Sequence, residues 1–257
     1  MNDLQDQDRQ WGLAAPRYDE LFLDPFDPAV ENPLIEALEA LPDPGAKVVA
    51  DLGCGTGVLL PMLVGRFGTI HALDFAPAMI AKAKKRMGKR AQRVNFLTRP
   101  MHHLDDLANS LDVALAVNSL VMPDVRLIDR TLRAIHKALR PGGVFLGVVP
   151  SIDAILYHTM LLMDRALDRG ATAEEAERSA AFHAEHSLYD FAFGRFRFHG
   201  IDQKFWHPFE ITYRLAKAGF ATVELGQVRY PWDESVPGGT EFSEHPRSWD
   251  WAFTARL

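Results

Sequence analysis

Hydrophobic and polar positions follow two different spacings that alternate along most of the chain. Short aliphatic runs predict buried strands, and stretches with apolar residues every three or four positions predict amphipathic helices. The predicted strands cover residues 48–52, 69–73, 94–99, 111–117 and 144–149. The predicted helices between and after them include residues 58–66 and 127–139. This alternation of strand and helix predicts an α/β fold.

The rest of the chain carries a second group of elements. Residues 209–218 predict a helix, 221–225 a strand, and 249–257 alternate like a last strand. Between 151 and 206 the pattern is helical at first, with a helix that begins after Ser151. Thr172 resembles an N-cap because Glu175 follows three residues later, so a second helix is predicted there.

A glycine-rich turn follows the first predicted strand. Asp51 ends the strand region, and Gly53, Gly55 and Gly57 then fall at alternate positions before an apolar helix. Glycines in such a turn allow a sharp bend and direct contact between the backbone and a ligand. The dinucleotide fingerprint requires a different spacing, with its third glycine one position later.

An acidic residue stands at the tip of the second predicted strand. Asp74 can there take the two ribose hydroxyls of an adenosine ligand, as in dinucleotide-binding folds. The alternative is that Asp74 only caps the next helix. Downstream, a helix, Pro141-Gly142-Gly143 and a buried strand follow in that order.

Together these motifs resemble the class I, Rossmann-like S-adenosylmethionine (SAM)-dependent methyltransferases, and are similar to methyltransferase types 11 and 25. The resemblance is tight over about residues 45–150 and loose over 205–257. It implies a doubly wound, mostly parallel seven-stranded sheet with a C-terminal antiparallel strand. It implies SAM as cofactor, with S-adenosylhomocysteine (SAH) as product. The chain would comprise an N-terminal lid segment (1–44), a SAM-binding core (45–150), a substrate-cap insert of helices and aromatic residues (151–206) and a completion of the sheet (207–257).

The resemblance also assigns cofactor contacts. The expected set is Tyr18, Asp51, Gly53, Cys54, Gly55, Gly57, Asp74, Phe75, Met79, Met101, His102 and Asn118. The chain departs from many relatives after the third strand, because no carboxylate stands where one would bind the adenine amino group. Backbone groups of Met101 and His102, or the side chain of Asp105, are the alternatives.

Acceptor residues are expected in the lid and the insert. Tyr18 is a lid candidate, and simple packing of an N-terminal helix is an equal alternative. The insert is rich in aromatic residues and histidines, which suits a small, partly apolar acceptor shielded from water. The expected substrate-binding residues are Tyr157, His158, His183 and Tyr189. A histidine suits removal of an acceptor proton, and His186 and His207 are the candidates.

Composition narrows the class of protein. The net charge of −6 makes a nucleic-acid surface unlikely. The basic stretch from Lys82 to Arg93 predicts a solvated helix face, with an anionic partner as the alternative. Cys54 is the only cysteine, so we expect no intramolecular disulfide, and the histidines show no metal-ligand spacing. We expect no membrane span, no signal peptide and a cytoplasmic protein. The pattern does not predict whether the protein is a monomer or a homodimer.

The expected function is SAM-dependent methyl transfer to an oxygen or nitrogen of a small acceptor. Residues 118–121 do not read Asn/Asp-Pro-Pro-Tyr/Phe, which disfavours base or amide nitrogens. The alternatives are a non-catalytic SAM-binding scaffold and an RNA or protein methyltransferase. A nicotinamide oxidoreductase is disfavoured by the glycine spacing.

Overall fold

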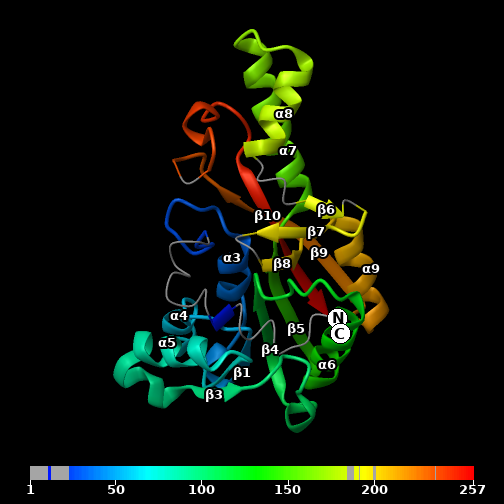
Figure 1. The fold of residues 1–257 in the computed structure, drawn as a ribbon. Coiled ribbons are helices and arrows are strands. Elements are labelled where there is room, and N and C mark those ends of the chain that lie inside the picture. The colour runs from blue at the N-terminus through cyan, green and yellow to red at the C-terminus, as the bar shows by residue number, and fades with distance from the viewer. Residues whose placement is uncertain (1–10, 13–22, 184–187, 191, 199–200, 235) are drawn as a thin grey trace.

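The computed structural model describes residues 11–12, 23–183, 188–190, 192–198, 201–234 and 236–257. A twisted central sheet carries helices on both faces, and a helical hairpin projects from one end (Figure 1). The sheet has seven strands in the order β3-β2-β1-β4-β5-β10-β9. A separate sheet has three strands in the order β6-β7-β8.

The seven-stranded sheet is mostly parallel. Its strands are β1 (Val48–Leu52), β2 (Thr69–Asp74), β3 (Asn95–Thr98), β4 (Leu111–Val117), β5 (Leu139–Val149), β9 (Thr222–Tyr230) and β10 (Ser248–Arg256). Strands β1 to β5 pair in parallel, whereas β10 pairs antiparallel with both β5 and β9. The predicted fold class, including the antiparallel strand near the C-terminus, is confirmed.

Helices cover both faces of this sheet because alternate strand residues point to opposite sides. The helices are α3 (Pro33–Glu39), α4 (Leu60–Val64), α5 (Pro77–Met87), α6 (Val125–Ala138), α7 (Ile152–Asp168), α8 (Ala173–His183) and α9 (Pro208–Ala218). Val49 packs in one core with α3, α4 and α5. Its neighbour Ala50 packs in the other core with α6 and α9. Packing in the two cores fixes the positions of the carboxyl ends of the parallel strands, where a ligand site can form.

Element boundaries differ in two places from the sequence-based expectation. Helix α4 covers only five of the nine residues expected in 58–66, with Pro61 in its first turn and Gly65 as its C-cap. The expected turn at 140–143 lies inside β5, which begins at Leu139 and shifts register opposite Leu111 and Val113. Both differences arise at proline and glycine, which a periodicity pattern does not place.

The insert folds into two parts. Ser151 caps α7, its side chain accepting a hydrogen bond from the amide of Ala154 (3.1 Å). Thr172 and Glu175 form the predicted capping box at the start of α8, each side chain accepting from the other's amide. After this hairpin, β6 (Leu188–Asp190), β7 (Arg195–Phe198) and β8 (Ile201–Lys204) form the small antiparallel sheet.

Candidate active site

A cavity opens beside the carboxyl ends of the parallel strands. Its volume is about 760 Å³, including the part open to solvent. Its wall contains Trp11, Gly53, Gly55, Asp74, Phe75, Met79, Pro100, Met101, His102, Asn118, Ser119, Val121, Met122, Pro123, Leu127, Thr131 and Asp202. In open α/β sheets ligands bind at this edge, so the cavity is the candidate active site.

The glycine turn forms one side of the cavity. The amides of Gly53 and Cys54 both donate to the carbonyl of Leu73, at 2.7 and 2.8 Å, which ties the turn to the end of β2. Gly53, Gly55 and Gly57 all have positive φ, at 72°, 52° and 78°. A Cβ on Gly55 would meet nothing within 4 Å, so this glycine leaves open space on the cavity side. Only glycine combines that conformation with that open approach at low cost.

Asp74 joins the turn to the second strand. One carboxylate oxygen accepts from the Gly55 amide at 3.0 Å, and the other accepts from the Ala76 amide at 2.9 Å. The N-cap of α5 is Ala76, so Asp74 is not itself the helix cap. The carboxylate lies in the cavity wall and is largely buried, with 7% of the residue exposed.

Three expected contact residues lie outside the wall. Asp51 lies near the end of β1 and is buried, and burial with the neighbouring Asp74 raises the pKa of its carboxyl to about 7. Cys54 is also buried, and burial raises the pKa of its thiol well above the usual value. Gly57 packs toward α5, where an added Cβ would lie 2.9 Å from Ala83 Cβ. These three residues support the turn from behind.

The opposite side is formed by the segments after β2 and β3. Phe75, Met79, Met101 and His102 all line the cavity, as expected for an adenine site. Asp105 is exposed and is not part of the wall, so that alternative for adenine recognition is disfavoured. Burial, and then the neighbouring His103 and Arg130, lower the pKa of His102, which favours its neutral form.

Asn118 is held in the wall by a polar cluster from the far end of the chain. It has a positive φ of 47°, and its Nδ2 donates to Asp250 Oδ2 at 3.3 Å. The same oxygen accepts from the Tyr230 hydroxyl at 2.8 Å, and the Ser151 amide donates to the other oxygen. Burial raises the pKa of Asp250 to about 6, against these hydrogen bonds, which lower it.

Two polar atoms of wall residues have no protein partner. They are Asn118 Oδ1 and Thr131 Oγ1, both buried and both without a hydrogen bond in the described structure. Because buried polar atoms are normally paired, each is available to a ligand in the cavity. Trp11, Leu127, Thr131 and Asp202 also belong to the wall, although the sequence-based analysis did not single them out.

The residues expected to bind the acceptor lie elsewhere. Tyr157 packs on Trp232 and Trp249, and His158 Nε2 lies 2.8 Å from the Pro237 carbonyl oxygen. Neither lines the cavity, because the outer half of α7 packs against the segment between β9 and β10. This corrects their expected role in the wall.

Of the other expected catalytic and acceptor residues, only His207 has a side chain in the described part of the structure. His207 stacks on Phe209 and has Nδ1 3.5 Å from Asp153 Oδ1, outside the cavity wall. Among histidines with described side chains, His102 is the one that lines the cavity. His183 ends α8 and Tyr189 lies in β6, with side chains outside the described part. Tyr18 and His186 lie outside the described residues.

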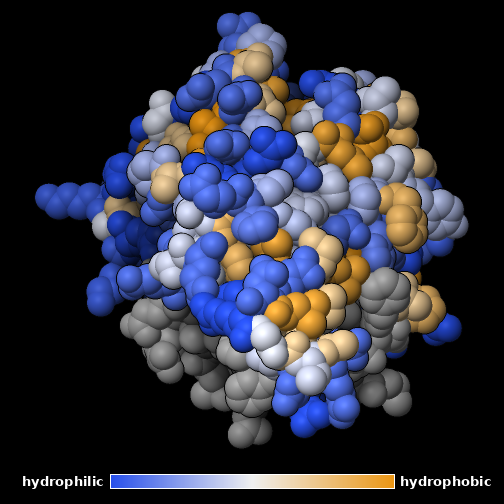
Figure 2. Space-filling model, turned by 90° about the horizontal axis from the view of Figure 1, so that it is seen from above, coloured by the Kyte–Doolittle hydropathy of each residue, from blue (hydrophilic) through white to orange (hydrophobic). Residues whose placement is uncertain are grey.

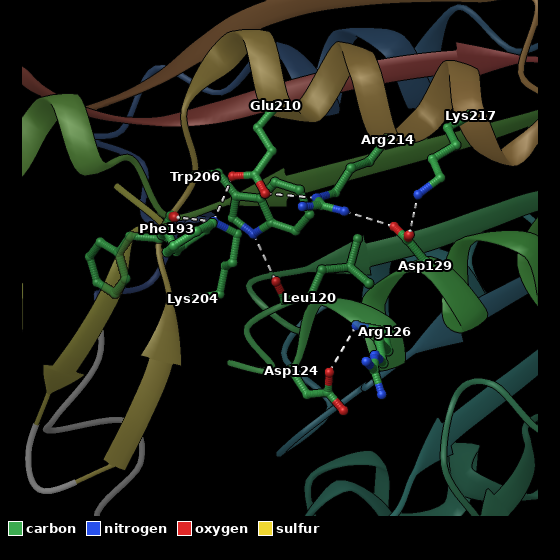
Figure 3. Close-up of polar contacts among 11 residues, drawn as sticks. Leu120, Asp124, Arg126, Asp129, Phe193, Lys204, Trp206, Glu210, Arg214 and Lys217 are labelled. Atoms are coloured by element: carbon green, nitrogen blue, oxygen red, sulfur yellow. Dashed lines mark hydrogen bonds and ion pairs between the residues drawn. The ribbon is translucent and has the colours of Figure 1, made fainter. Parts of the chain in front are cut away.

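A chain of ion pairs, largely buried except at Lys217, connects residues near the small sheet with α9 and α6 (Figure 3). Lys204 Nζ lies 2.6 Å from Glu210 Oε2, and Arg214 Nε donates to the other Glu210 oxygen at 2.7 Å. Arg214 and Lys217 then both contact Asp129 of α6, at 2.9 and 2.7 Å. The chain therefore ties β8 to α9 and α6.

The same region clamps the loop after β4. The Lys204 amide donates to the Val121 carbonyl at 2.8 Å, and Trp206 Nε1 donates to the Leu120 carbonyl at 2.8 Å. Lys204 Nζ also donates to the carbonyl of Phe193. Since Val121 and Asp202 line the cavity, these bonds fix the acceptor side of the wall.

The outer surface carries separate hydrophobic patches among polar residues on the face seen from above (Figure 2). Lys84, Lys85 and Arg86 of α5 are exposed, whereas Met79, Ala83 and Met87 of the same helix are buried. In the part of the chain that the structure describes, no helix has the length and apolar character needed to cross a membrane. Among the same residues, no cluster of three or more His, Cys, Asp or Glu side chains is placed to hold a metal ion.

Comparison with known proteins identifies the core around the glycine turn. Residues 49–143 match the family described as a methyltransferase domain. These residues are therefore similar to the class I SAM-dependent methyltransferases. The methyltransferase domain thus contains the turn, Asp74, Met101 and Asn118, and its family cofactor is SAM. The fit is supported by the open space at Gly55 and the unpartnered Asn118 oxygen.

Individual relatives extend this likeness beyond the domain. A malonyl-[acyl-carrier protein] O-methyltransferase of Dechloromonas aromatica is 31% identical over 150 residues, 57% of this chain and 50% of that protein. A trans-aconitate 2-methyltransferase of Deinococcus radiodurans is 32% identical over 155 residues, 59% of this chain and 54% of that protein. The chain therefore spans about half the length of these relatives.

A solved structure shows the same fold over nearly the whole chain. It is the 1,6-didemethyltoxoflavin-N1-methyltransferase of Burkholderia thailandensis, with bound 1,6-didemethyltoxoflavin and SAH. The TM-score is 0.60 at 20% identity, with 97% of this chain and 86% of that one covered. The methyltransferase fold thus includes the antiparallel strands that follow the matched domain.

Proposed function

We propose that this chain transfers the methyl group of SAM to an oxygen or nitrogen of a small, partly apolar acceptor. The observation that carries the proposal is a single cavity with two unlike sides. The wall combines the glycine turn, Asp74 and Met79, against which Trp11 packs, with an apolar part that includes Val121 and Met122. Its polar and apolar parts suit a nucleoside cofactor beside a partly apolar second ligand.

On the cofactor side, the residues can bind and orient an adenosine. Asp74 lies at the tip of β2, where a carboxylate can accept hydrogen bonds from ribose hydroxyls. Gly55 allows the ligand to lie against the backbone, and Phe75 and Met79 offer apolar surface to a base. SAM, when bound, supplies an electrophilic methyl carbon on a sulfonium.

On the acceptor side, the chain's work is alignment and exclusion of water. Val121, Met122 and Leu127 give this part of the wall its apolar character. The acceptor lone pair bonds to the methyl carbon while the carbon–sulfur electrons stay on sulfur, and fixed geometry lowers the barrier. Where the acceptor carries a proton, neutral His102 is placed in the wall to receive it.

The relatives' names support a small acceptor. They are a malonyl-[acyl-carrier protein] O-methyltransferase and a trans-aconitate 2-methyltransferase. Both names describe methyl transfer to acids, so the oxygen branch of the proposal has support from sequence. The acceptor of this chain remains part of the proposal, since the likeness covers about half of each relative.

The test is calorimetric titration with SAM and with SAH, followed by transfer of a labelled methyl group to phenols, amines and carboxylates. Micromolar binding of both nucleosides with turnover of a panel compound is the expected result. Binding of both without turnover would favour a SAM-binding scaffold. Absence of binding would overturn the proposal.

A further inference from the structure

The insert contributes a carboxylate to the cavity. Among the described residues of 151–206, Asp202 is the one that lines the wall, although the sequence predicted an aromatic and histidine-rich cap. Phe205 and Trp206 lie in the hydrophobic cores instead, and Phe193 is 54% exposed. The insert therefore gives the wall an acidic side chain where an aromatic and histidine-rich cap was expected.

Arg197 holds the Asp202 carboxylate in one orientation. The two residues are direct partners in the β7–β8 register. Arg197 Nε lies 2.6 Å from one carboxylate oxygen, and Nη2 lies 3.2 Å from the other. This two-point contact fixes the carboxylate plane. The Asp202 side chain is 21% exposed and the Arg197 side chain 60% exposed, so the guanidinium faces solvent more than the cavity.

The strand beneath Asp202 is anchored as well. Lys204 follows two residues later on the same face of β8, and its side chain is fully buried against Glu210. Its amide is bonded to the Val121 carbonyl, so Asp202 lies near the apolar part of the wall. A carboxylate held this firmly is a recognition group of fixed position.

The charge of the wall favours one sign of ligand. Asp74 and Asp202 are its acidic residues, and in the described part of the chain no lysine or arginine side chain lines it. An ammonium ion would gain a charge-assisted hydrogen bond from the carboxylate of Asp202. A carboxylate ligand would face like charge in a mostly apolar wall, which is costly.

From this arrangement we infer that the acceptor is a primary or secondary amine, recognised as its ammonium ion by Asp202. The inference rests on the proposed function and narrows it to nitrogen. It separates this chain from the two relatives whose names describe acids. The bound ammonium loses one proton to neutral His102, which passes it to solvent, and the freed lone pair forms the bond to the methyl carbon as the carbon–sulfur bond breaks. The products are the methylated ammonium and SAH.

The test compares two probes that share a phenyl ring and differ in charge, 2-phenylethylamine and 3-phenylpropionate. Their dissociation constants are measured by calorimetry on the protein saturated with SAH. We expect the amine to bind at least tenfold more tightly than the acid. Equal affinity, tighter binding of the acid, or binding of neither probe would overturn the inference. Failure to bind SAH would instead overturn the proposed function, so the two outcomes are distinct.

Three variants show whether Asp202 carries the selectivity. Asp202→Asn should lower the amine-to-acid affinity ratio at least tenfold, with SAH affinity unchanged. Arg197→Gln removes the same ion pair but keeps the carboxylate, so it should retain the amine preference. Glu174→Gln removes an exposed pair with Arg178 on α8 and should change nothing. If the amine-to-acid affinity ratio falls equally in Asp202→Asn and Arg197→Gln, the effect comes from the structure of the β7–β8 strand pair. That result would contradict recognition by Asp202.

Labelled methyl transfer supplies a second readout. Given SAM, the wild-type protein should methylate 2-phenylethylamine, and Asp202→Asn should raise KM for the amine by at least tenfold. Methylation of 3-phenylpropionate at a comparable kcat/KM would contradict the inference.

Discussion

The ammonium nitrogen of Lys204 lies 2.6 Å from a carboxylate oxygen of Glu210, with 0% and 11% of the two side chains exposed. Burial lowers the pKa of Lys204, and the Glu210 carboxylate opposes part of that shift. Removing one member of a buried pair costs more than the pair contributes, because the other charge is left uncompensated. The pair joins β8 of the insert to α9, and substitution of either residue should destabilise the folded protein.

Lys204→Met should lower the free energy of unfolding by about 3–5 kcal/mol, because the carbonyl of Phe193 and one Glu210 oxygen lose their donor. Urea unfolding of the wild type, Lys204→Met, Glu210→Leu and the double variant measures the coupling energy between Lys204 and Glu210. We expect a coupling energy of about 0.5–3 kcal/mol. Strict additivity of the two single variants would show that the contact is not energetically coupled.

Gly55→Ala and Gly170→Ala should separate backbone strain from ligand contact. Both glycines have positive φ, at 52° and 88°, and both have open space where a Cβ would stand. Each substitution should therefore cost about 1–2 kcal/mol of stability. Only Gly55 lines the cavity, so only Gly55→Ala should also weaken SAH, by at least tenfold in calorimetry. An equal loss of SAH affinity in both variants would contradict direct contact at Gly55.

Asp74→Ala should weaken SAH binding at least tenfold, because a hydrogen bond to a charged group contributes about 1.5–3 kcal/mol. The carboxylate also accepts hydrogen bonds from the Gly55 and Ala76 amides. Loss of a ribose contact must therefore be distinguished from a general loss of the glycine-turn structure. An SAH analogue without the 2′-hydroxyl serves this purpose. The analogue should bind the wild type more weakly than SAH does, whereas Asp74→Ala should bind the analogue and SAH with equal affinity. If the analogue loses the same affinity in both proteins, Asp74 does not bind the ribose.

Asp51 should make stability depend on pH near neutrality. Burial raises the pKa of its carboxyl to about 7 in the folded protein from an ordinary value of 3.8, so the folded state holds more protons between these values. The free energy of unfolding should therefore fall as the pH rises from about 4 to about 7, and level off above. Asp250, with a pKa of about 6, acts in the same direction at lower pH.

Urea unfolding at pH 6 and pH 7 isolates the Asp51 contribution. The wild type should lose up to about 1 kcal/mol over this step, since one pKa unit corresponds to about 1.4 kcal/mol. Asp51→Asn, which cannot ionise, should lose clearly less. Equal losses in the two proteins would assign the titration to other groups.

The sheet and most of the cofactor side could be predicted because they depend on local signals. A glycine spacing, an acidic strand end and apolar periodicity are all written in contiguous residues, and the structure brings Gly53, Asp74, Met101 and Asn118 into one wall. Trp11, Thr131 and Asp202 reach that wall from three distant segments. Only the tertiary fold determines their position, so no short pattern indicated them.

Several residues expected on the acceptor side lie outside the cavity wall for a physical reason. Aromatic richness in the insert suggested a cap over the site, yet Trp206 packs in the core with α6 and α9, and Phe205 packs on Ile152 of α7. Tyr157 packs on Trp232 and on Trp249 of β10, and His158 packs on Trp232. Buried charges such as Lys204 leave no periodic signal, since lysine is ordinarily read as a surface residue.

The position of β10 also determines when the seven-stranded sheet can be completed during synthesis of the chain. This strand lies between β5 and β9, so the β5 edge lacks its partner until residues 248–256 have been synthesised. Asn118 likewise awaits Asp250, its partner on that strand. During translation, a ribosome-bound chain that ends before residue 248 holds the parallel half with an open edge. Pairing of β5 with β9 through β10 therefore waits for residues that lie about a hundred positions further along the chain than β5.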